Sequence, residues 1–276
     1  MNDTLSAARP GHIAEPGTTI LAAEGLRKQF GAGDTTFLAI ENVSFTLQRG
    51  EFVCIVGPSG AGKTTLLNCL TGLMSPSSGT VEFEGKPIAS PPAGMAVVFQ
   101  DYGRSLFPWL NVAHNVAFPL RGKGIDRSEI DARVDSALVA VGLRDTRRKY
   151  PWQLSGGMQQ RVAIARALAY KPDCLVMDEP FASVDAQTRF ELEDLLLQVR
   201  HDYGISVLFV THDIDEAVYL SDRVVVLTRS PASVREVITV DLERPRDQAK
   251  TRRDPLFSDL RTTLFELVQT QHGDDD

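Results

Sequence analysis

The sequence predicts an α/β fold: a mostly parallel β-sheet flanked by helices and interrupted by a helical insertion. Short apolar runs rich in branched residues are typical of the buried strands of such a sheet, and here they read FVCIV, AVVF, CLVMD, VLFVT and RVVVL. Helical patterns separate several of these runs. Between about Tyr102 and Tyr170 the strand pattern gives way to helix-compatible sequence such as SEIDARVDSALVAVGL, which predicts an all-helical insertion within the α/β core.

Length and composition are those of an ordinary globular protein, because 276 residues with 43% hydrophobic composition can bury a sizeable core. The 29 basic and 36 acidic residues give a net charge of −7, which argues against a protein that coats nucleic acid. No apolar stretch reaches the roughly 18 to 20 residues that span a bilayer, and the first residues lack the apolar segment of a signal peptide. We therefore expect a soluble chain.

The three cysteines are Cys54, Cys69 and Cys174, widely separated and each among apolar neighbours. This spacing does not fit a disulfide framework or a zinc site. Buried free thiols in a reducing cytoplasm are the expected state of all three.

The strongest motif is GPSGAGKTT at residues 57–65, between the strand pattern EFVCIV and the helical pattern TTLLNCLTGL. Glycines let the backbone curl so that successive N–H groups face one concavity at the positive end of a helix dipole, where a phosphate fits. Lys63 can then reach the β and γ phosphates of a nucleotide, and the Thr64 hydroxyl can ligate Mg²⁺. A glycine-rich turn that only joins strand to helix would not require this full pattern. The residues expected to bind nucleotide are Gly57, Pro58, Ser59, Gly60, Ala61, Gly62, Lys63, Thr64 and Thr65.

Two carboxylates follow the apolar strand pattern in CLVMDEP, residues 174–180. Asp178, at the end of the strand, is placed to hold the shell of Mg²⁺, and Glu179 beside it can orient and deprotonate an attacking water. An isolated acidic pair after a strand is commonly only solvated. In combination with residues 57–65, the pair predicts hydrolysis of a nucleoside triphosphate.

His212 ends a further strand pattern in VLFVTHD, where its imidazole can donate a hydrogen bond to the γ-phosphate or to the water. A phosphate-binding loop alone fits a kinase, a GTPase, a helicase or a transport ATPase. The guanine-reading sequence NKxD is absent, which argues against a GTPase. The helical block lies too far from the loop in sequence to resemble the lid of a small-molecule kinase.

A second helix start rich in flexible residues occurs in LSGGMQQR, residues 154–161. Ser155, Gly156 and Gly157 are expected to present exposed amides and a hydroxyl at the positive end of that helix. The alternative is a glycine-rich cap without a ligand. The first reading gives the chain two sites that bind phosphate.

The longer run LSGGMQQRVAIARAL resembles the signature sequence of ATP-binding-cassette (ABC) ATPases, and the resemblance extends over about residues 18–265 with the motifs in the family's order. It implies a P-loop NTPase (RecA-like) core with an antiparallel β subdomain and an inserted α-helical subdomain at about residues 101–170. The ABC ATPase domain is expected at 18–240, between a disordered segment at 1–17 and a C-terminal amphipathic helix and tail at 241–276. The cofactors implied are ATP and Mg²⁺.

The resemblance assigns further residues one at a time. Phe30 in LRKQFG is similar to the aromatic that stacks on adenine, with Phe37 as a rival and a core position as the alternative. Gln100, ending the strand AVVFQ, resembles the glutamine that touches Mg²⁺ and water and links the core to the insertion. Asp185 in ASVDAQTR resembles the aspartate of a loop that passes between two subunits, although Val184 stands where the family more often has Leu. Catalysis is assigned to Lys63, Gln100, Glu179 and His212, and the metal to Thr64, Gln100 and Asp178.

The same resemblance implies a cycle in which ATP binding draws two copies together and hydrolysis lets them part. The signature of one copy, at Ser155, Gly156 and Gly157, closes over ATP held by the phosphate loop of the other. The partners expected are a second copy of the chain, integral membrane permease subunits and, indirectly, a solute-binding protein, but no nucleic acid. This places the chain peripherally at the cytoplasmic face of the inner membrane.

Large apolar residues after Gln100 are expected either to dock a permease helix or to form the core of the insertion. They are Leu106, Phe107, Trp109 and Leu110.

Three segments resemble the nitrate, sulfonate and taurine importer branch: SLFPWLNVAHNV, LSGGMQQRV and ERPRDQAKTRRDPLFSDLRTTLFELV. This implies uptake of such an anion, and related branches that import bicarbonate, riboflavin-like or pyrimidine precursors stay open. An exporter or lipid-transport ATPase would share every catalytic residue. A non-transport cassette acting on DNA or ribosomes usually has two cassettes or a long coiled-coil insertion, whereas this chain has one cassette and no heptad run.

Overall fold

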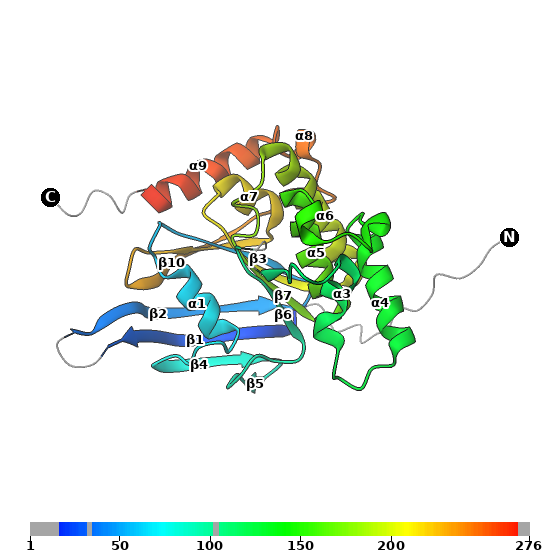
Figure 1. The fold of residues 1–276 in the computed structure, drawn as a ribbon. Coiled ribbons are helices and arrows are strands. Elements are labelled where there is room, and N and C mark those ends of the chain that lie inside the picture. Colours follow the sequence, from blue (N-terminus) through cyan, green and yellow to red (C-terminus); the bar gives the residue numbers. More distant parts are fainter. Residues whose placement is uncertain (1–16, 32–34, 102–104, 270–276) are drawn as a thin grey trace.

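A mixed β-sheet with helices on both faces forms the centre of the chain (Figure 1), in a computed structural model that describes residues 17–31, 35–101 and 105–269. The expectation of disorder at 1–17 falls, apart from residue 17, outside the described residues. Within the described ranges, none of the helices combines the length and apolarity needed to span a membrane.

The sheet has the strand order β5-β4-β1-β2-β10-β9-β3-β8-β7-β6. Its strands are β1 (Thr19–Phe30), β2 (Phe37–Gln48), β3 (Phe52–Val56), β4 (Ser78–Phe83), β5 (Lys86–Pro87), β6 (Met95–Val98), β7 (Cys174–Asp178), β8 (Ser206–Val210), β9 (Arg223–Leu227) and β10 (Ala232–Thr239). Strands β5, β4, β1 and β2 pair antiparallel, and β9, β3, β8, β7 and β6 pair parallel. Strand β10 joins the two parts, running parallel to β2 and antiparallel to β9.

The helices form distinct groups around this sheet. They are α1 (Lys63–Leu70), α3 (Val112–Ala117), α4 (Arg127–Ala140), α5 (Gly156–Ala169), α6 (Ala186–Tyr203), α7 (Ile214–Leu220), α8 (Gln248–Thr251) and α9 (Pro255–Gln269). Figure 1 shows α3 and α4 at one side with α5 next to them, and α7, α8 and α9 together with α6 on the other side of the parallel strands from the antiparallel part. The predicted α/β fold is confirmed, and the described part of the insertion is helical.

Strand β3 explains why the parallel strands read as continuous apolar runs. All five of its residues are buried, because helices or strands cover both faces of the sheet. Its side chains alternate between two hydrophobic clusters. Phe52, Cys54 and Val56 join the cluster beneath α5, α6 and α7, whereas Val53 and Ile55 join the cluster around α1 and the antiparallel strands. The predicted free thiols are confirmed as buried.

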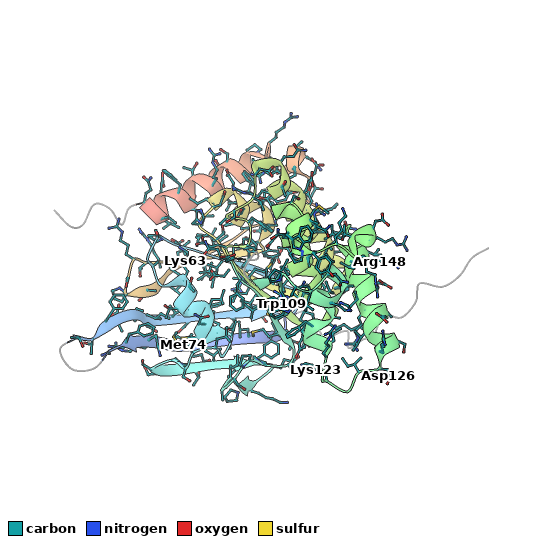
Figure 2. The ribbon with its side chains drawn as sticks, viewed as in Figure 1. Lys63, Met74, Trp109, Lys123, Asp126 and Arg148 are labelled. Carbon is teal, nitrogen blue, oxygen red and sulfur yellow. The ribbon has the colours of Figure 1, made fainter. Side chains whose placement is uncertain are left out.

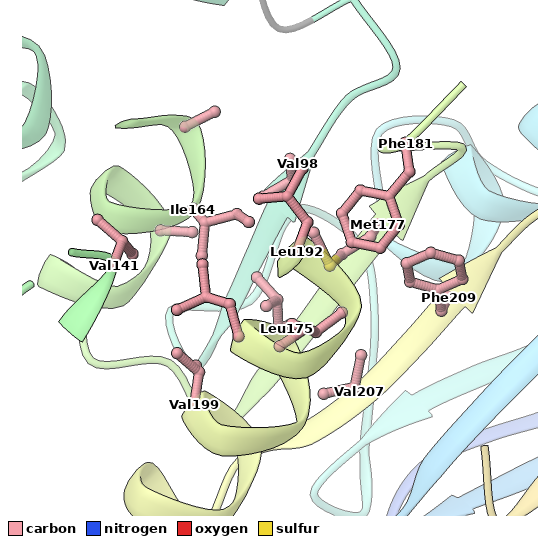
Figure 3. Close-up of a cluster of buried hydrophobic side chains, with 14 of the residues drawn as sticks. Val98, Val141, Ile164, Leu175, Met177, Phe181, Leu192, Val199, Val207 and Phe209 are labelled. Carbon is pink, nitrogen blue, oxygen red and sulfur yellow. The ribbon is translucent and has the colours of Figure 1, made fainter. Parts of the chain in front are cut away.

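The first cluster fixes the segment that follows β7 (Figure 3). Side chains from β7 and β8 meet those of α5 and α6 in this cluster. The Phe181 ring lies 5.4 Å from the Phe209 ring, centroid to centroid, and both side chains are fully buried. Because Phe181 lies just after the two carboxylates at the end of β7, its burial anchors the turn that carries them.

In the C-terminal segment the four-residue α8 precedes α9, the longer helix of this segment. Helix α9 buries Phe257 and Leu264 and exposes part of Phe265. Arg252, between the two helices, pairs with the buried Glu193 of α6 at 2.9 Å and lies over the rings of Phe190, Tyr219 and Phe257. These contacts hold the segment against α6 and α7.

Two strand ends differ from the prediction: β8 ends at Val210, so His212 lies two residues beyond it, and β6 also ends early. Strand β6 ends at Val98, the last residue that pairs with β7, so Gln100 lies two residues beyond the strand rather than at its end. The apolar run continues through Phe99, but that side chain is exposed. Apolar character alone therefore misplaced the end of this strand, where pairing with β7 stops.

Candidate functional site

The loop at residues 57–62 joins β3 to α1, as the sequence predicted. Gly60 and Gly62 have φ angles of 77° and 83°, a left-handed conformation that favours glycine. Gly62 also passes close to β2, since a Cβ added there would lie 3.0 Å from the Ala39 carbonyl oxygen. The loop thus curls tightly before the helix begins, and the free N–H groups at the start of α1 lie at its concavity.

Lys63 is the first residue of α1, and Figure 2 shows it in the interior of the molecule. Its ammonium donates to the carbonyl oxygens of Gly57 at 3.0 Å and Pro58 at 3.1 Å, and lies 4.0 Å from Glu179 Oε1. Burial lowers the pKa of Lys63, and the nearby Glu179 and Asp178 carboxylates oppose that shift. The lysine therefore folds back over the loop at the position where a phosphate would bind.

Asp178 and Thr64 face each other across the ends of β7 and α1. The Thr64 hydroxyl donates to Asp178 Oδ2 at 3.1 Å. Burial raises the pKa of Asp178, whose residue is only 5% exposed, and the bond from Thr64 opposes the shift. A buried carboxylate beside a hydroxyl supplies two hard oxygen donors. This fits Mg²⁺ at phosphate sites, where the protein supplies only one or two ligands and water and phosphate oxygens supply the rest.

Glu179 turns away from the strand because its backbone has φ of 40°, in the left-handed region that non-glycine residues rarely adopt. Its N–H still donates to the Val210 carbonyl oxygen at 2.8 Å. The turned carboxylate meets two of the predicted residues: Oε2 lies 3.0 Å from His212 Nδ1 and accepts from Gln100 Nε2 at 3.3 Å. Glu179 thus contacts Lys63, Gln100 and His212, and Asp178 precedes it at the end of β7.

Ser155 caps helix α5, where its hydroxyl oxygen accepts from the Met158 N–H at 3.4 Å. Asp185 caps α6 in the same way, accepting from the Thr188 N–H at 3.0 Å and the Thr188 hydroxyl at 2.7 Å. These hydrogen bonds lower the pKa of Asp185. The two helix starts touch, because a Cβ added to Gly157 would lie 2.3 Å from Thr188 Cγ2. The close packing against α6 therefore favours glycine at 157.

Phe30 and Phe37 are paired across the end of the β1–β2 hairpin. Both rings are exposed, so Phe30 is not the core residue that was weighed as an alternative. The Ala39 contact with Gly62 places this end of β2 close to the phosphate loop. Either ring can offer an exposed aromatic face to a base, so both Phe30 and Phe37 are candidates for stacking on adenine.

The apolar residues after Gln100 divide between core and surface. Leu106 is buried in the core, whereas Trp109 is 71% exposed. The Phe107 ring lies 5.4 Å from Trp109 and 4.5 Å from Phe118, centroid to centroid. A groove of about 360 Å³ runs beside these rings between β6, the residues that flank α3, and α5. Among the residues that line it are Phe107, Phe118, Pro119, Arg166 and Tyr170.

Four polar residues near His212 were not singled out from the sequence: Arg189, Thr211, Asp213 and Glu216. Arg189 lies one helical turn after Asp185, which places both at the start of α6. Thr211 and Asp213 flank His212 directly. Their positions close to the motif residues Asp185 and His212 indicated that they could lie near the site. Nothing in the sequence spacing indicated that the four residues contact one another.

Comparison with known proteins identifies the class to which this fold and site belong. The family profile described as ABC transporter matches residues 40–182. The chain belongs to the ABC transporter family. It is an ATP-binding subunit of this family, an ATPase whose hydrolysis of ATP drives transport.

Relatives match over nearly the whole chain. The bicarbonate transport ATP-binding protein CmpD of Synechocystis sp. is 40% identical over 99% of both chains. The nitrate import ATP-binding protein NrtD of Synechococcus elongatus is 41% identical over 99% of this chain and 100% of its own. An uncharacterized ABC transporter ATP-binding protein of Methanocaldococcus jannaschii, MJ0412, is 48% identical over 91% of this chain and 92% of its own.

Solved structures agree with the fold. The dimeric bacterial ABC transporter cassette MJ0796 matches with a TM-score of 0.70 and 31% identity over 80% of this chain and 99% of its own. The CbiO1 subunit from Clostridium perfringens, part of the transporter complex CbiONQ, matches with a TM-score of 0.73 and 32% identity over 80% of this chain and 89% of its own. The predicted P-loop core is confirmed by these likenesses.

Proposed function

We propose that this chain is the ATPase subunit of an importer for a small anion, with nitrate, sulfonate, taurine and bicarbonate as the substrate class. The observation that carries this proposal is the full-length match, at 40% and 41% identity, to a bicarbonate transport and a nitrate import protein. The match covers the C-terminal segment as well as the cassette. The substrate itself would pass through a separate permease, supplied by a solute-binding protein.

The hydrolytic step is assigned to the residues gathered around Glu179. The loop at 57–62 and Lys63 hold the phosphates of ATP, and Glu179 orients the attacking water and accepts its proton. With a proton on each ring nitrogen, His212 donates from Nδ1 to the Glu179 carboxylate at 3.0 Å and from Nε2 to the γ-phosphate. Gln100 contacts the same carboxylate and so links the site to the helical insertion that follows it in the chain.

Thr64, Asp178 and Gln100 are the residues that would hold Mg²⁺. The buried Asp178 carboxylate and the adjacent Thr64 hydroxyl supply oxygen donors at the phosphate end of the loop. When bound, Mg²⁺ neutralises charge on the β and γ phosphates. The adenine is assigned to Phe30, with Phe37 as the rival.

A second copy of the chain completes each nucleotide site in this proposal. Ser155, Gly156 and Gly157 present the start of α5 to ATP held by the other copy, and Asp185 lies at the contact between the copies. The likeness to a dimeric cassette supports this arrangement. The dimer is assigned to the cytoplasmic face of the inner membrane as a peripheral subunit.

The groove beside Phe107 and Phe118 is proposed to receive a helix of the permease. It is lined by the aromatic side chains that flank α3 and by residues of α5, the helix that carries the signature. Trp109 stands exposed next to it, shown in Figure 2, and an exposed aromatic anchor of this kind is typical of interface centres. Leu106, being buried, contributes to the core instead.

The catalytic assignment is tested with Glu179→Gln. The glutamine keeps the size and polarity of the side chain but cannot accept the proton, so we expect kcat to fall by about 10² to 10⁴ while ATP still binds. Phosphate release and ATP binding, measured side by side on the purified protein, check this. Normal turnover in the variant would remove Glu179 from the role of base.

The substrate class is tested in cells that lack the gene for this chain. Uptake of labelled nitrate, bicarbonate, taurine and an alkanesulfonate is measured after complementation with the wild-type chain or with Glu179→Gln. We expect one anion to be taken up with the wild-type chain only. Trapping Glu179→Gln with ATP and identifying the membrane proteins that copurify then names the permease; loss of a lipid-transport or export activity instead would overturn the import proposal.

A further inference from the structure

The loop that carries His212 is fixed at its two neighbours. The Thr211 hydroxyl donates to Glu216 Oε2 at 2.6 Å and accepts from the Asp213 N–H at 3.0 Å. Asp213 Oδ1 accepts from the N–H groups of Asp215 at 2.9 Å and Glu216 at 3.2 Å, which caps α7. The His212 side chain has no such support from the loop, and among the described residues its only side-chain hydrogen bond is to Glu179.

A guanidinium from a different helix reaches this loop. Arg189 Nη1 donates to Asp213 Oδ2 at 2.9 Å, and Arg189 Nε lies 3.5 Å from Glu216 Oε1. The backbone N–H of Arg189 donates to the carbonyl oxygen of Asp185 at 2.9 Å, so the side chain is carried on the first turn of α6. Asp213 therefore uses one oxygen to cap its own helix and the other to bind α6.

The first turn of α6 is itself held in place. Asp185 caps it through both the N–H and the hydroxyl of Thr188. Thr188 in turn packs against Gly157, at the start of α5. Arg189 thus connects a rigid turn, which contacts the signature, to the loop whose imidazole faces Glu179.

We propose that Arg189 is a positioning residue for hydrolysis: through Asp213 it holds the His212 loop so that the imidazole stays at the Glu179 carboxylate. This inference rests on the proposed roles of Glu179 and His212. The fold of α7 does not depend on the contact, because the Asp213 cap uses the other carboxylate oxygen. Loss of the contact frees the loop to move, and a displacement of about 1 Å in a reacting group can cost about 10²-fold in rate.

The first test compares Arg189→Gln with Arg189→Lys. For Arg189→Gln we expect kcat to fall by about tenfold or more, with KM for ATP changed less than about twofold, because Arg189 touches none of residues 57–65. Arg189→Lys should recover part of the loss, since an ammonium can pair with Asp213 but cannot also reach Glu216 as a fork. Equal kcat in all three proteins would overturn the proposal, as would a fall in kcat matched by an equal loss of ATP binding.

Arg133→Gln is the matched control. Arg133, on α4, is an arginine of similar exposure, 21% against 27% for Arg189, and it too forms an ion pair, with Glu129 at 2.6 Å. It lies on a helix of the insertion and carries no proposed role. We expect the kcat of Arg133→Gln to equal that of the wild type. A fall equal to that of Arg189→Gln would mean that loss of any partly buried, ion-paired arginine lowers kcat, and would contradict a specific role for Arg189.

The decisive test repeats Arg189→Gln in a His212→Ala background. If Arg189 acts through His212, its removal lowers kcat no further once the imidazole is gone. A further tenfold fall in the double variant would show that Arg189 acts elsewhere and would overturn the inference. If His212→Ala alone keeps normal turnover, the proposed role of His212 fails, which separates the two hypotheses.

Folding is followed in every variant by its thermal midpoint. Should Arg189→Gln be poorly folded, Asp213→Asn removes the same ion pair from the other side, while its amide oxygen still caps α7. The same loss of kcat at unchanged KM is expected from Asp213→Asn. Wild-type turnover in a folded Asp213→Asn protein would contradict the proposal.

Discussion

Asp178 and Glu179 are adjacent carboxylates with different surroundings because the backbone turns between them. Asp178 continues β7 and is buried against Thr64. Glu179 adopts a φ of 40° and swings its carboxylate to His212 and Gln100. A left-handed conformation at a non-glycine residue costs free energy, and the surrounding fold must enforce it. The buried Phe181, two residues after Glu179, anchors the turn and so helps to enforce this conformation.

Glu216 is a second residue whose environment has a measurable consequence. Burial raises its pKa from 4.5 to about 7, helped by Asp213 and Glu193 and opposed by the bond from Thr211 and by Arg189. The folded protein therefore keeps this proton to a higher pH than the unfolded chain does. The contribution of Glu216 to stability is fully present below about pH 4.5 and declines as the pH rises toward about 7.

We expect Glu216→Gln to remove that decline. Glutamine keeps an acceptor for Thr211 and carries no charge, so its free energy of unfolding relative to the wild type should improve by about 3 kcal/mol between pH 4.5 and 8. Denaturant unfolding at pH 4.5 and pH 8 measures this difference. The exposed Glu41 of β2 supplies the control, Glu41→Gln; identical pH slopes for Glu216→Gln and the wild type would contradict the assignment.

At this scale the sequence predicted the residues that belong to motifs and missed those that support them. Lys63, Asp178 and Glu179 follow strand patterns with a chemistry that needs those residue types. Arg189 and Glu216 meet only in the folded chain, across two helices. Arginine and glutamate are common on helix surfaces, so their identity alone carried no signal of a buried contact.

At the scale of the elements, the site forms because three parallel strands end at the same edge of the sheet. The Glu179 N–H donates to Val210 O at 2.8 Å, and the Thr211 N–H donates to Ile55 O at 3.1 Å. These bonds tie the ends of β7, β8 and β3 together. A motif after a parallel strand is thereby brought to its neighbours, which is why the sequence was sufficient to group them.

The packing of α5 on α6 was not visible in the sequence and leads to a prediction for Gly157→Ala. Alanine would ordinarily favour a helix by about 0.5 to 1 kcal/mol over glycine. Here its Cβ would lie 2.3 Å from Thr188 Cγ2. Thr188 cannot rotate freely, because its hydroxyl donates to Asp185. We expect a net loss of about 1 to 3 kcal/mol in the free energy of unfolding, with reduced ATPase activity.

Thr188→Ser provides the matched suppressor, since serine lacks Cγ2 but keeps the hydroxyl that bonds Asp185. Denaturant unfolding and phosphate release are measured for the two single variants and the double variant. Thr188→Ser alone should be near the wild type, and the double variant should regain most of the lost stability. A double variant no better than Gly157→Ala would show that the clash lies elsewhere.

On the scale of the whole molecule, the two helix starts proposed to bind phosphate belong to different parts of the fold. The phosphate loop precedes α1, whereas Ser155 begins α5 beside the helical insertion. Figure 1 shows α1 next to the antiparallel strands, with α5 on the side of α3 and α4. Two copies arranged as a symmetric pair can place the α5 of each against the loop of the other. The sequence indicated this through the family resemblance alone, because neither helix pattern reveals which copy it serves.

That arrangement predicts complementation between two defective copies. Lys63→Ala removes the ammonium at the phosphate loop and should weaken ATP binding by about tenfold. Ser155→Asp keeps α5 capped, because aspartate is as good an N-cap as serine, but places a negative charge where the phosphate would bind. Each variant alone should have low ATPase activity.

In a mixed pair, one site combines both defects and the other combines an intact loop with an intact signature. An equal mixture that pairs at random should therefore regain about a quarter of the wild-type activity. Phosphate release from each protein alone and from the mixture measures this at equal total concentration, with a mixture of Lys63→Ala and wild type to calibrate exchange between pairs. If the loop and the signature served ATP within a single chain, every chain in the mixture would be defective and no activity would return.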